Sequence, residues 1–159
     1  MPRTGDFGLL GIVSPIGLSV VLGAHRQHCD AFGRFVAIEV GADVTNTAID
    51  KDYPVRRCQA GCLGQALRRS GYRGPFGFDA FRYTNAAGRE AVHPLCEINA
   101  RLSFGFLARA LRERLILAGR LAPTDGLTLH LATPKQAAPA PADTAAEVLA
   151  YDRDGAPLA

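Results

Sequence analysis

The part of the chain between Gly71 and Arg101 constrains the fold more than any other. Residues 76–83 are rich in aromatic residues, which favour strands, and residues 84–88 (Thr-Asn-Ala-Ala-Gly) are of the kinds that let a chain reverse. A second strand is predicted over about residues 91–99. Two strands joined by so short a turn are expected to pair as an antiparallel hairpin.

Three oxygen-bearing side chains of this hairpin are predicted to lie together. Glu97 and Asn99 are two positions apart, so on a strand they point to the same face. Asp79 can lie beside them if the two strands are antiparallel neighbours. Mg²⁺ (or Mn²⁺) favours such oxygen ligands, and Mg²⁺ keeps places for water and substrate phosphates. The pattern therefore predicts a metal site, and the alternative is a polar-edged hairpin with these three residues merely solvated.

The hairpin resembles the C-terminal half of the ATP-grasp domain, which is found in ATP-dependent carboxylate–amine ligases. In that family a Gly-x-x-Gly-x-Asp strand pairs with a strand that ends in Glu-x-Asn-x-Arg. The matching residues here are Gly74, Gly77, Asp79, Glu97, Asn99 and Arg101. The resemblance implies that Asp79, Glu97 and Asn99 hold the metal ions that bridge the phosphates of ATP. It also implies that Asn99 and Arg101 bind the nucleotide, and that Arg101 is catalytic and faces phosphate or the acyl phosphate intermediate.

The order of elements around the hairpin is the one that the resemblance implies for this half-domain. We expect strands over residues 19–26 and 35–40, a helix over about 54–70, a helix after Arg101 and a short strand over 127–132. The predicted fold is α+β, with an antiparallel sheet and helices packed on one face, over residues 18–132. Residues 1–17 are expected to be a short N-terminal lead. Residues 133–159 are expected to be an Ala/Pro-rich linker with a short terminal strand.

In ATP-grasp enzymes the adenine pocket and the phosphate-contacting lysines come largely from segments before this half. The two lysines of this chain, Lys51 and Lys135, do not match those positions. We therefore expect half of an active site, which binds ATP and Mg²⁺ and acts on small carboxylate and amine substrates only when another chain completes it. The alternative is a non-catalytic remnant that acts as an interaction module, because exposed sheet edges favour pairing with a partner or with a second copy.

Composition narrows the class of protein. A chain of 159 residues that is 48% hydrophobic can bury a core. No run of about 18 apolar residues is present, so we expect no membrane span. The N-terminus lacks the pattern of a signal peptide, so a cytoplasmic location is expected. The net charge of +3 comes from arginines on predicted helix faces, without interleaved aromatics, and we expect no nucleic-acid partner.

The cysteines and His93 are the remaining candidates for functional residues. Cys58 and Cys62 are expected on the apolar stripe of their helix, so we predict them reduced and buried against the sheet rather than bound to zinc. His93 shares strand parity with Glu97 and precedes Pro94, which predicts an edge strand or a bulge there. His93 either approaches substrate or has a structural role.

Overall fold

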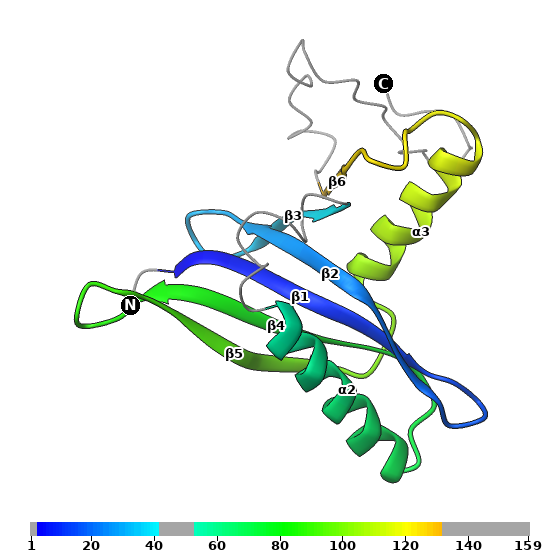
Figure 1. Ribbon diagram of the computed structural model, residues 1–159. Coiled ribbons are helices and arrows are strands. Elements are labelled where there is room, and N and C mark those ends of the chain that lie inside the picture. Colours follow the sequence, from blue (N-terminus) through cyan, green and yellow to red (C-terminus); the bar gives the residue numbers. More distant parts are fainter. Residues whose placement is uncertain (1–2, 42–52, 132–159) are drawn as a thin grey trace.

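The computed structural model describes residues 3–41 and 53–131, which form a six-stranded sheet and two helices (Figure 1). The order in the sheet is β5-β4-β1-β2-β3-β6, and every neighbouring pair is antiparallel. The strands are β1 (Arg3–Val13), β2 (Ser19–Cys29), β3 (Phe35–Val40), β4 (Gly74–Thr84), β5 (Glu90–Asn99) and β6 (Leu127–His130), and the helices are α2 (Tyr53–Arg69) and α3 (Phe104–Leu117). The predicted α+β class with an antiparallel sheet is confirmed. Lys51, Lys135 and the segment after residue 131 lie outside the described residues.

Two hairpins close as the turn residues predict. The backbone N–H of Gly33 donates to the carbonyl of Asp30, and that of Gly88 donates to the carbonyl of Asn85. Both glycines have positive φ, near 77° and 70°, which a residue with a Cβ adopts at a cost. The carboxylate of Asp30 and the amide oxygen of Asn85 each accept two further backbone N–H groups. These turns fix the registers of β2 with β3 and of β4 with β5.

Strand β1 is the main feature that was not predicted from the sequence. Residues 3–13 were expected in a short lead, but they form a strand between β4 and β2, at the middle of the sheet. Leu9 and Leu10 are both buried although they point to opposite faces. A strand that is buried on both faces shows a continuous apolar run rather than alternation, so its periodicity does not reveal it.

The two helices cover different faces of the sheet. Leu9 of β1 packs with Ala60 of α2, whereas the next residue, Leu10, lies 3.1 Å from where a Cβ on Gly105 of α3 would be. Helix α2 packs against β1 and β2, and α3 packs against β3 and β6 (Figure 1). The expectation of helices on one face is therefore corrected. Because β1 is apolar on both sides, each face of the sheet needs its own cover.

Helix α2 approaches the sheet through small residues, and the predicted stripe is wrong. Ala60 is fully buried, and a Cβ on Gly64 would lie 1.8 Å from Ser19 Oγ, so the backbone comes very close to the strands. Cys58 and Cys62 are free but exposed, which contradicts their predicted burial. The buried stripe is displaced by two positions, or roughly 200° around a helix, so these cysteines lie on the outward side.

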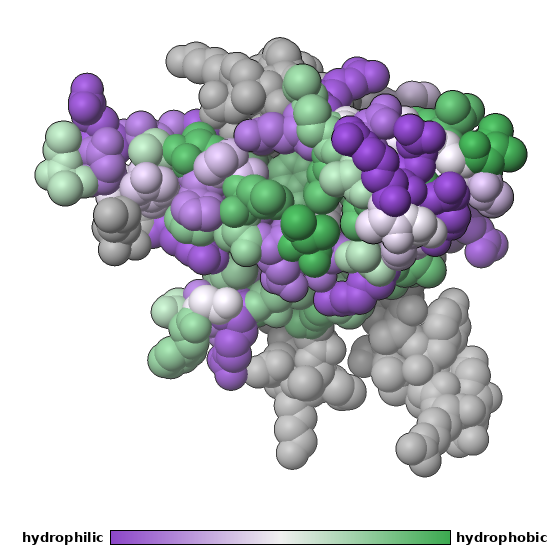
Figure 2. Space-filling view, turned by 90° about the horizontal axis from the view of Figure 1, so that it is seen from below, coloured by the Kyte–Doolittle hydropathy of each residue, from purple (hydrophilic) through white to green (hydrophobic). Residues whose placement is uncertain are grey.

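Apolar side chains also remain on the surface. Figure 2 shows hydrophobic residues among hydrophilic ones on the face seen from below. The exposed large apolar residues include Leu95 and Ile98 of β5, at one edge of the sheet, and Leu102 and Phe104 just beyond that strand. Neither α2 nor α3 has the length and apolarity of a bilayer-spanning helix.

Candidate metal-binding site

The structure brings the three predicted metal ligands together on the face of the sheet that α3 packs against. Asp79 of β4 is directly opposite Glu97 of β5, and Gly77 is directly opposite Asn99. Side chains that face each other in an antiparallel pair have Cβ atoms about 4.5–5.5 Å apart. The parity argument therefore places Glu97 and Asn99 on the same side as Asp79. Their role as metal ligands stays a prediction.

Asp79 is the centre of a hydrogen-bonded group. Its Oδ1 accepts a hydrogen bond from Gln27 Nε2 at 2.7 Å, and its Oδ2 accepts one from Asn99 Nδ2 at 3.1 Å. Because the amide nitrogen of Asn99 is used in this way, its amide oxygen is the atom left for a cation. Both hydrogen bonds orient the Asp79 carboxylate before any ligand binds.

The electrostatics of Asp79 favour a cation beside it. Burial raises the pKa of Asp79 above its ordinary value, and the nearby Glu97 carboxylate raises it further. The hydrogen bonds from Gln27 and Asn99, and the charge of Arg101, act on this pKa in the opposite direction. A divalent cation would relieve both the loss of solvation and the repulsion between the two carboxylates.

These residues line a cleft of about 270 Å³. Its lining includes Asp79, Glu97, Asn99 and Arg101, and also the start of α3 with Ser103, Phe104 and Gly105. His25 and Gln27 of β2 complete the polar lining. The cleft therefore combines two carboxylates with the N-terminal end of a helix.

The donor set fits Mg²⁺ better than zinc. The described residues contain no group of three or more His, Cys, Asp and Glu side chains placed to hold a metal ion. A structural zinc site needs four such ligands, whereas Mg²⁺ is often held by one or two carboxylates together with water and substrate phosphates. Asp79 and Glu97, with the amide oxygen of Asn99, satisfy the second requirement.

His25 and Gln27 were not among the residues predicted from the sequence. They are two positions apart on β2 and reach Asp79 across β1, where Gly8 pairs with both His25 and Asp79. Because Gly8 has no side chain, groups from β2 and β4 can meet above it. The alternation of His25 and Gln27 was a visible signal, but the intervening strand was not recognised.

His93 has a packing role in the structure. Strand β5 is an edge strand, and its register with β4 shifts between Asp79 and Phe81, as expected near Pro94. The imidazole of His93 stacks on Phe81 with ring centroids 4.9 Å apart, and the Arg3 guanidinium lies 4.1 Å from the Phe81 centroid. These contacts favour the structural alternative.

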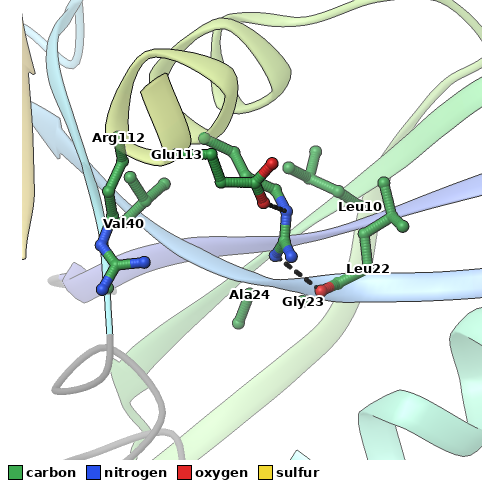
Figure 3. Close-up of a pocket in the computed structure, with 9 residues that line it drawn as sticks. Leu10, Leu22, Gly23, Ala24, Val40, Arg112 and Glu113 are labelled. Carbon is green, nitrogen blue, oxygen red and sulfur yellow. Dashed lines mark hydrogen bonds and ion pairs between the residues drawn. The ribbon is translucent and has the colours of Figure 1, made fainter. Parts of the chain in front are cut away.

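A second, smaller cavity of about 150 Å³ lies between α3 and β2 (Figure 3). Arg109 Nη1 donates to the carbonyl of Leu22 at 2.7 Å, and Arg109 Nε pairs with Glu113 at 3.1 Å. Arg112 Nε donates to the carbonyl of Asp125 at 2.8 Å. These polar groups join α3 to its surroundings, so the cavity has a structural explanation.

No protein-family model matches this sequence, and no curated protein matches it. Similar solved structures do exist. The crystal structure of N5-carboxyaminoimidazole ribonucleotide synthetase from Thermus thermophilus has a TM-score of 0.50 at 11% identity, over 80% of this chain and 35% of that one.

Two other solved structures are similar at lower TM-scores. N5-carboxyaminoimidazole synthetase from Staphylococcus aureus, complexed with ADP, has a TM-score of 0.47 at 9% identity, over 80% of this chain and 33% of that one. Biotin carboxylase from Campylobacter jejuni has a TM-score of 0.46 at 13% identity, over 70% of this chain and 23% of that one. This chain thus spans about a third or less of these three proteins. The similarity to the Thermus thermophilus structure shows that the chain has the α+β fold expected from the resemblance to the C-terminal half of ATP-grasp enzymes.

Proposed function

We propose that this chain binds Mg²⁺ and ATP as the C-terminal part of an ATP-grasp carboxylate–amine ligase. The observation that carries the proposal is the pairing of Asp79 with Glu97 across β4 and β5, with Asn99 bonded to Asp79, at the wall of a cleft. The fold supports it, because these residues occupy the strands that the resemblance predicts. The match of Gly74, Gly77 and Arg101 to the same pattern adds to this support.

Each residue of the site would have a separate role. Asp79 and Glu97 would hold the metal through carboxylate oxygens, and Asn99 would present its amide oxygen. Bound Mg²⁺ would neutralise charge on the nucleotide phosphates as a carboxylate attacks the γ-phosphate. Arg101 lines the same cleft and is exposed, so its guanidinium would bind phosphate or the acyl phosphate. An amine would then displace phosphate from the activated carboxylate.

Titration calorimetry with Mg²⁺–ATP tests the proposal, with Mn²⁺ binding followed by electron paramagnetic resonance as a second readout. Glu97→Gln keeps the size of the side chain but removes its charge, and should weaken Mn²⁺ binding. Outer-shell partners of metal ligands are worth about 10- to 100-fold in metal affinity, so the loss of a ligand should cost no less.

Glu90→Gln is the matched control for this substitution. Glu90 is on the same strand but at its opposite end, where it pairs with Arg82. The proposal requires Glu90→Gln to bind Mn²⁺ as the unaltered chain does. Equal affinity of the unaltered chain and the Glu97→Gln variant, or no binding of Mn²⁺ and Mg²⁺–ATP by the unaltered chain, would contradict it.

The second candidate is an interaction module, which the edge strand β5 favours. This strand exposes Leu95 and Ile98, and an unpaired edge offers backbone groups to another strand. If the chain acts in this way, light scattering should show association that a Leu95→Lys/Ile98→Lys variant abolishes. If the chain is a monomer at all concentrations tested, the module does not act by self-association.

A further inference from the structure

His25 is a buried imidazole with one nitrogen left without a partner. Its side chain is only 3% exposed, and it lines the cleft beside Gln27 and Asp79. Among the described residues, no group forms a hydrogen bond with its Nδ1, which is fully buried. Buried polar atoms are nearly always hydrogen-bonded, so an exception needs an explanation.

Gln27 determines which nitrogen of His25 carries the proton. The Gln27 amide nitrogen donates to Asp79 Oδ1 and lies 3.3 Å from His25 Nε2. The reverse orientation would place the Gln27 amide oxygen against the Asp79 carboxylate. The NH₂ group therefore faces His25 Nε2, which must accept, and the proton of the neutral ring is on Nδ1. Burial also lowers the pKa of His25 to about 4, so the ring is neutral near pH 7.

The ring is confined between β1 and α3. A Cβ on Gly8 would lie 2.6 Å from His25 Nε2, and a Cβ on Gly105 would lie 3.0 Å from His25 Nδ1. Glycine at both positions makes room for the ring but little more. The Nδ1–H group therefore faces the first turn of α3, and an acceptor in the cleft can reach it only if the ring or that turn shifts slightly.

The surroundings of Nδ1 suit an anionic oxygen. In α3 the N–H groups of Phe106 and Leu107 donate to the Ser103 carbonyl, whereas the N–H groups before them come too early in the helix to have an i−4 partner within it. Ser103 at the N-cap forms no side-chain capping bond within the described part of the chain. The 14 residues of α3 direct the positive end of the helix dipole toward the same place. Arg101 lines the cleft and adds a full positive charge.

We propose that His25 is a ligand-binding residue whose Nδ1–H donates a hydrogen bond to an anionic oxygen of a carboxylate or phosphate group in this cleft. The inference rests on the proposed function only for the identity of the physiological ligand. The position of the donor and its tautomer follow from His25 and Gln27, which both lie on β2. Gln27 is then a positioning residue that connects the donor with Asp79.

Nitrogen-15 NMR of the full chain labelled in its histidine rings tests this inference without ATP or metal. Inorganic phosphate and acetate are added in separate titrations, with sodium chloride at matched ionic strength as the control. We expect His25 to show the neutral Nδ1–H form and to shift saturably with phosphate, acetate or both, but not with chloride. The anion that causes the shift identifies whether the cleft accepts a phosphate oxygen or a carboxylate oxygen.

Two substitutions separate the donor from the bulk of the ring. His25→Asn places an amide nitrogen near the position of Nδ1, whereas His25→Gln reaches toward Nε2 and leaves the Nδ1 position empty. A hydrogen bond to a charged group is worth about 10- to 100-fold in affinity, so His25→Gln should weaken anion binding by that factor. His25→Asn should retain most of the affinity.

A His25 signal that stays unchanged in both the phosphate and acetate titrations would overturn the inference, as would an Nε2–H form. Shifts confined to the other histidines would also overturn it. The spectrum of the unaltered chain decides the question even if a variant fails to fold. A shift of His25 without Mg²⁺–ATP binding refutes only the proposed function, and Mg²⁺–ATP binding with His25 unmoved refutes only this inference.

Discussion

Replacing Gly8 by alanine should destabilise the fold by about 1 kcal/mol and disturb the candidate site. The new Cβ would lie 2.6 Å from Cε1 and Nε2 of His25 and 2.9 Å from Asp79 Oδ1, well inside ordinary contact distances. Overpacking of a core costs about 1–3 kcal/mol, and removing a glycine from a strand interior recovers about 0.5–1 kcal/mol. The difference is about 0–2.5 kcal/mol, with a central value of about 1 kcal/mol.

Urea denaturation followed by circular dichroism measures this change as a shift in midpoint at constant slope. Gly5→Ala is the matched control on the same strand, because nothing lies within 4 Å of its Cβ. That variant should be as stable as the unaltered chain or slightly more stable. If Gly8→Ala were more stable than the unaltered chain, the confinement of His25 would be refuted. With His25→Ala the clash with the ring disappears and only the close approach to Asp79 Oδ1 remains, so the two effects should not add.

Three further predictions concern charge and exposure. The pKa of Asp79 is raised above 3.8 in the folded chain. Ionisation of Asp79 should therefore have no effect on stability below pH 3.8, and should destabilise the fold as the pH rises through the folded pKa. Asp79→Asn should lack this decline, and parallel stability–pH profiles would contradict the assignment. Glu97→Gln should leave the free energy of unfolding within about 0.5 kcal/mol of that of the unaltered chain, since Glu97 is exposed. Cys58 and Cys62 should react with a thiol reagent in the native state, and reaction only after unfolding would show that they are buried.

Local patterns predicted the hairpins well, and they failed where packing uses small residues. The turn at Asn85 is predictable because its side chain and the glycine that follows have specific backbone roles. The contact face of α2 was misplaced because the sheet packs on Ala60 and Gly64 rather than on large apolar residues. Gly105 of α3 likewise lies close to side chains of the sheet. Small residues allow close approach of backbones, but they carry no strong hydrophobic signal.

The site was predictable to the extent that it depends on neighbouring strands. The parity of Glu97 and the short turn before it place Glu97 near Asp79, and the register shift between Asp79 and Phe81 brings the two directly opposite each other. Gln27 and His25 come from β2, which is separated from β4 by β1, and no local pattern reveals that order. Their contribution needed the full sheet, in which a glycine at position 8 lets side chains from both flanking strands meet.

The arrangement on this face is costly for a purely structural hairpin. Helix α3 packs against β3 and β6, while Asp79 of β4 and Glu97 of β5 line the cleft on the same face of the sheet. An unpartnered imidazole nitrogen of His25 and a carboxylate with a raised pKa lie within one hydrogen-bonded group there. Each opposes stability, and apolar residues in their places would not. Such departures from the rules of packing are expected where function requires them. The explanation by function therefore requires that substitutions which relieve these costs also weaken ligand binding.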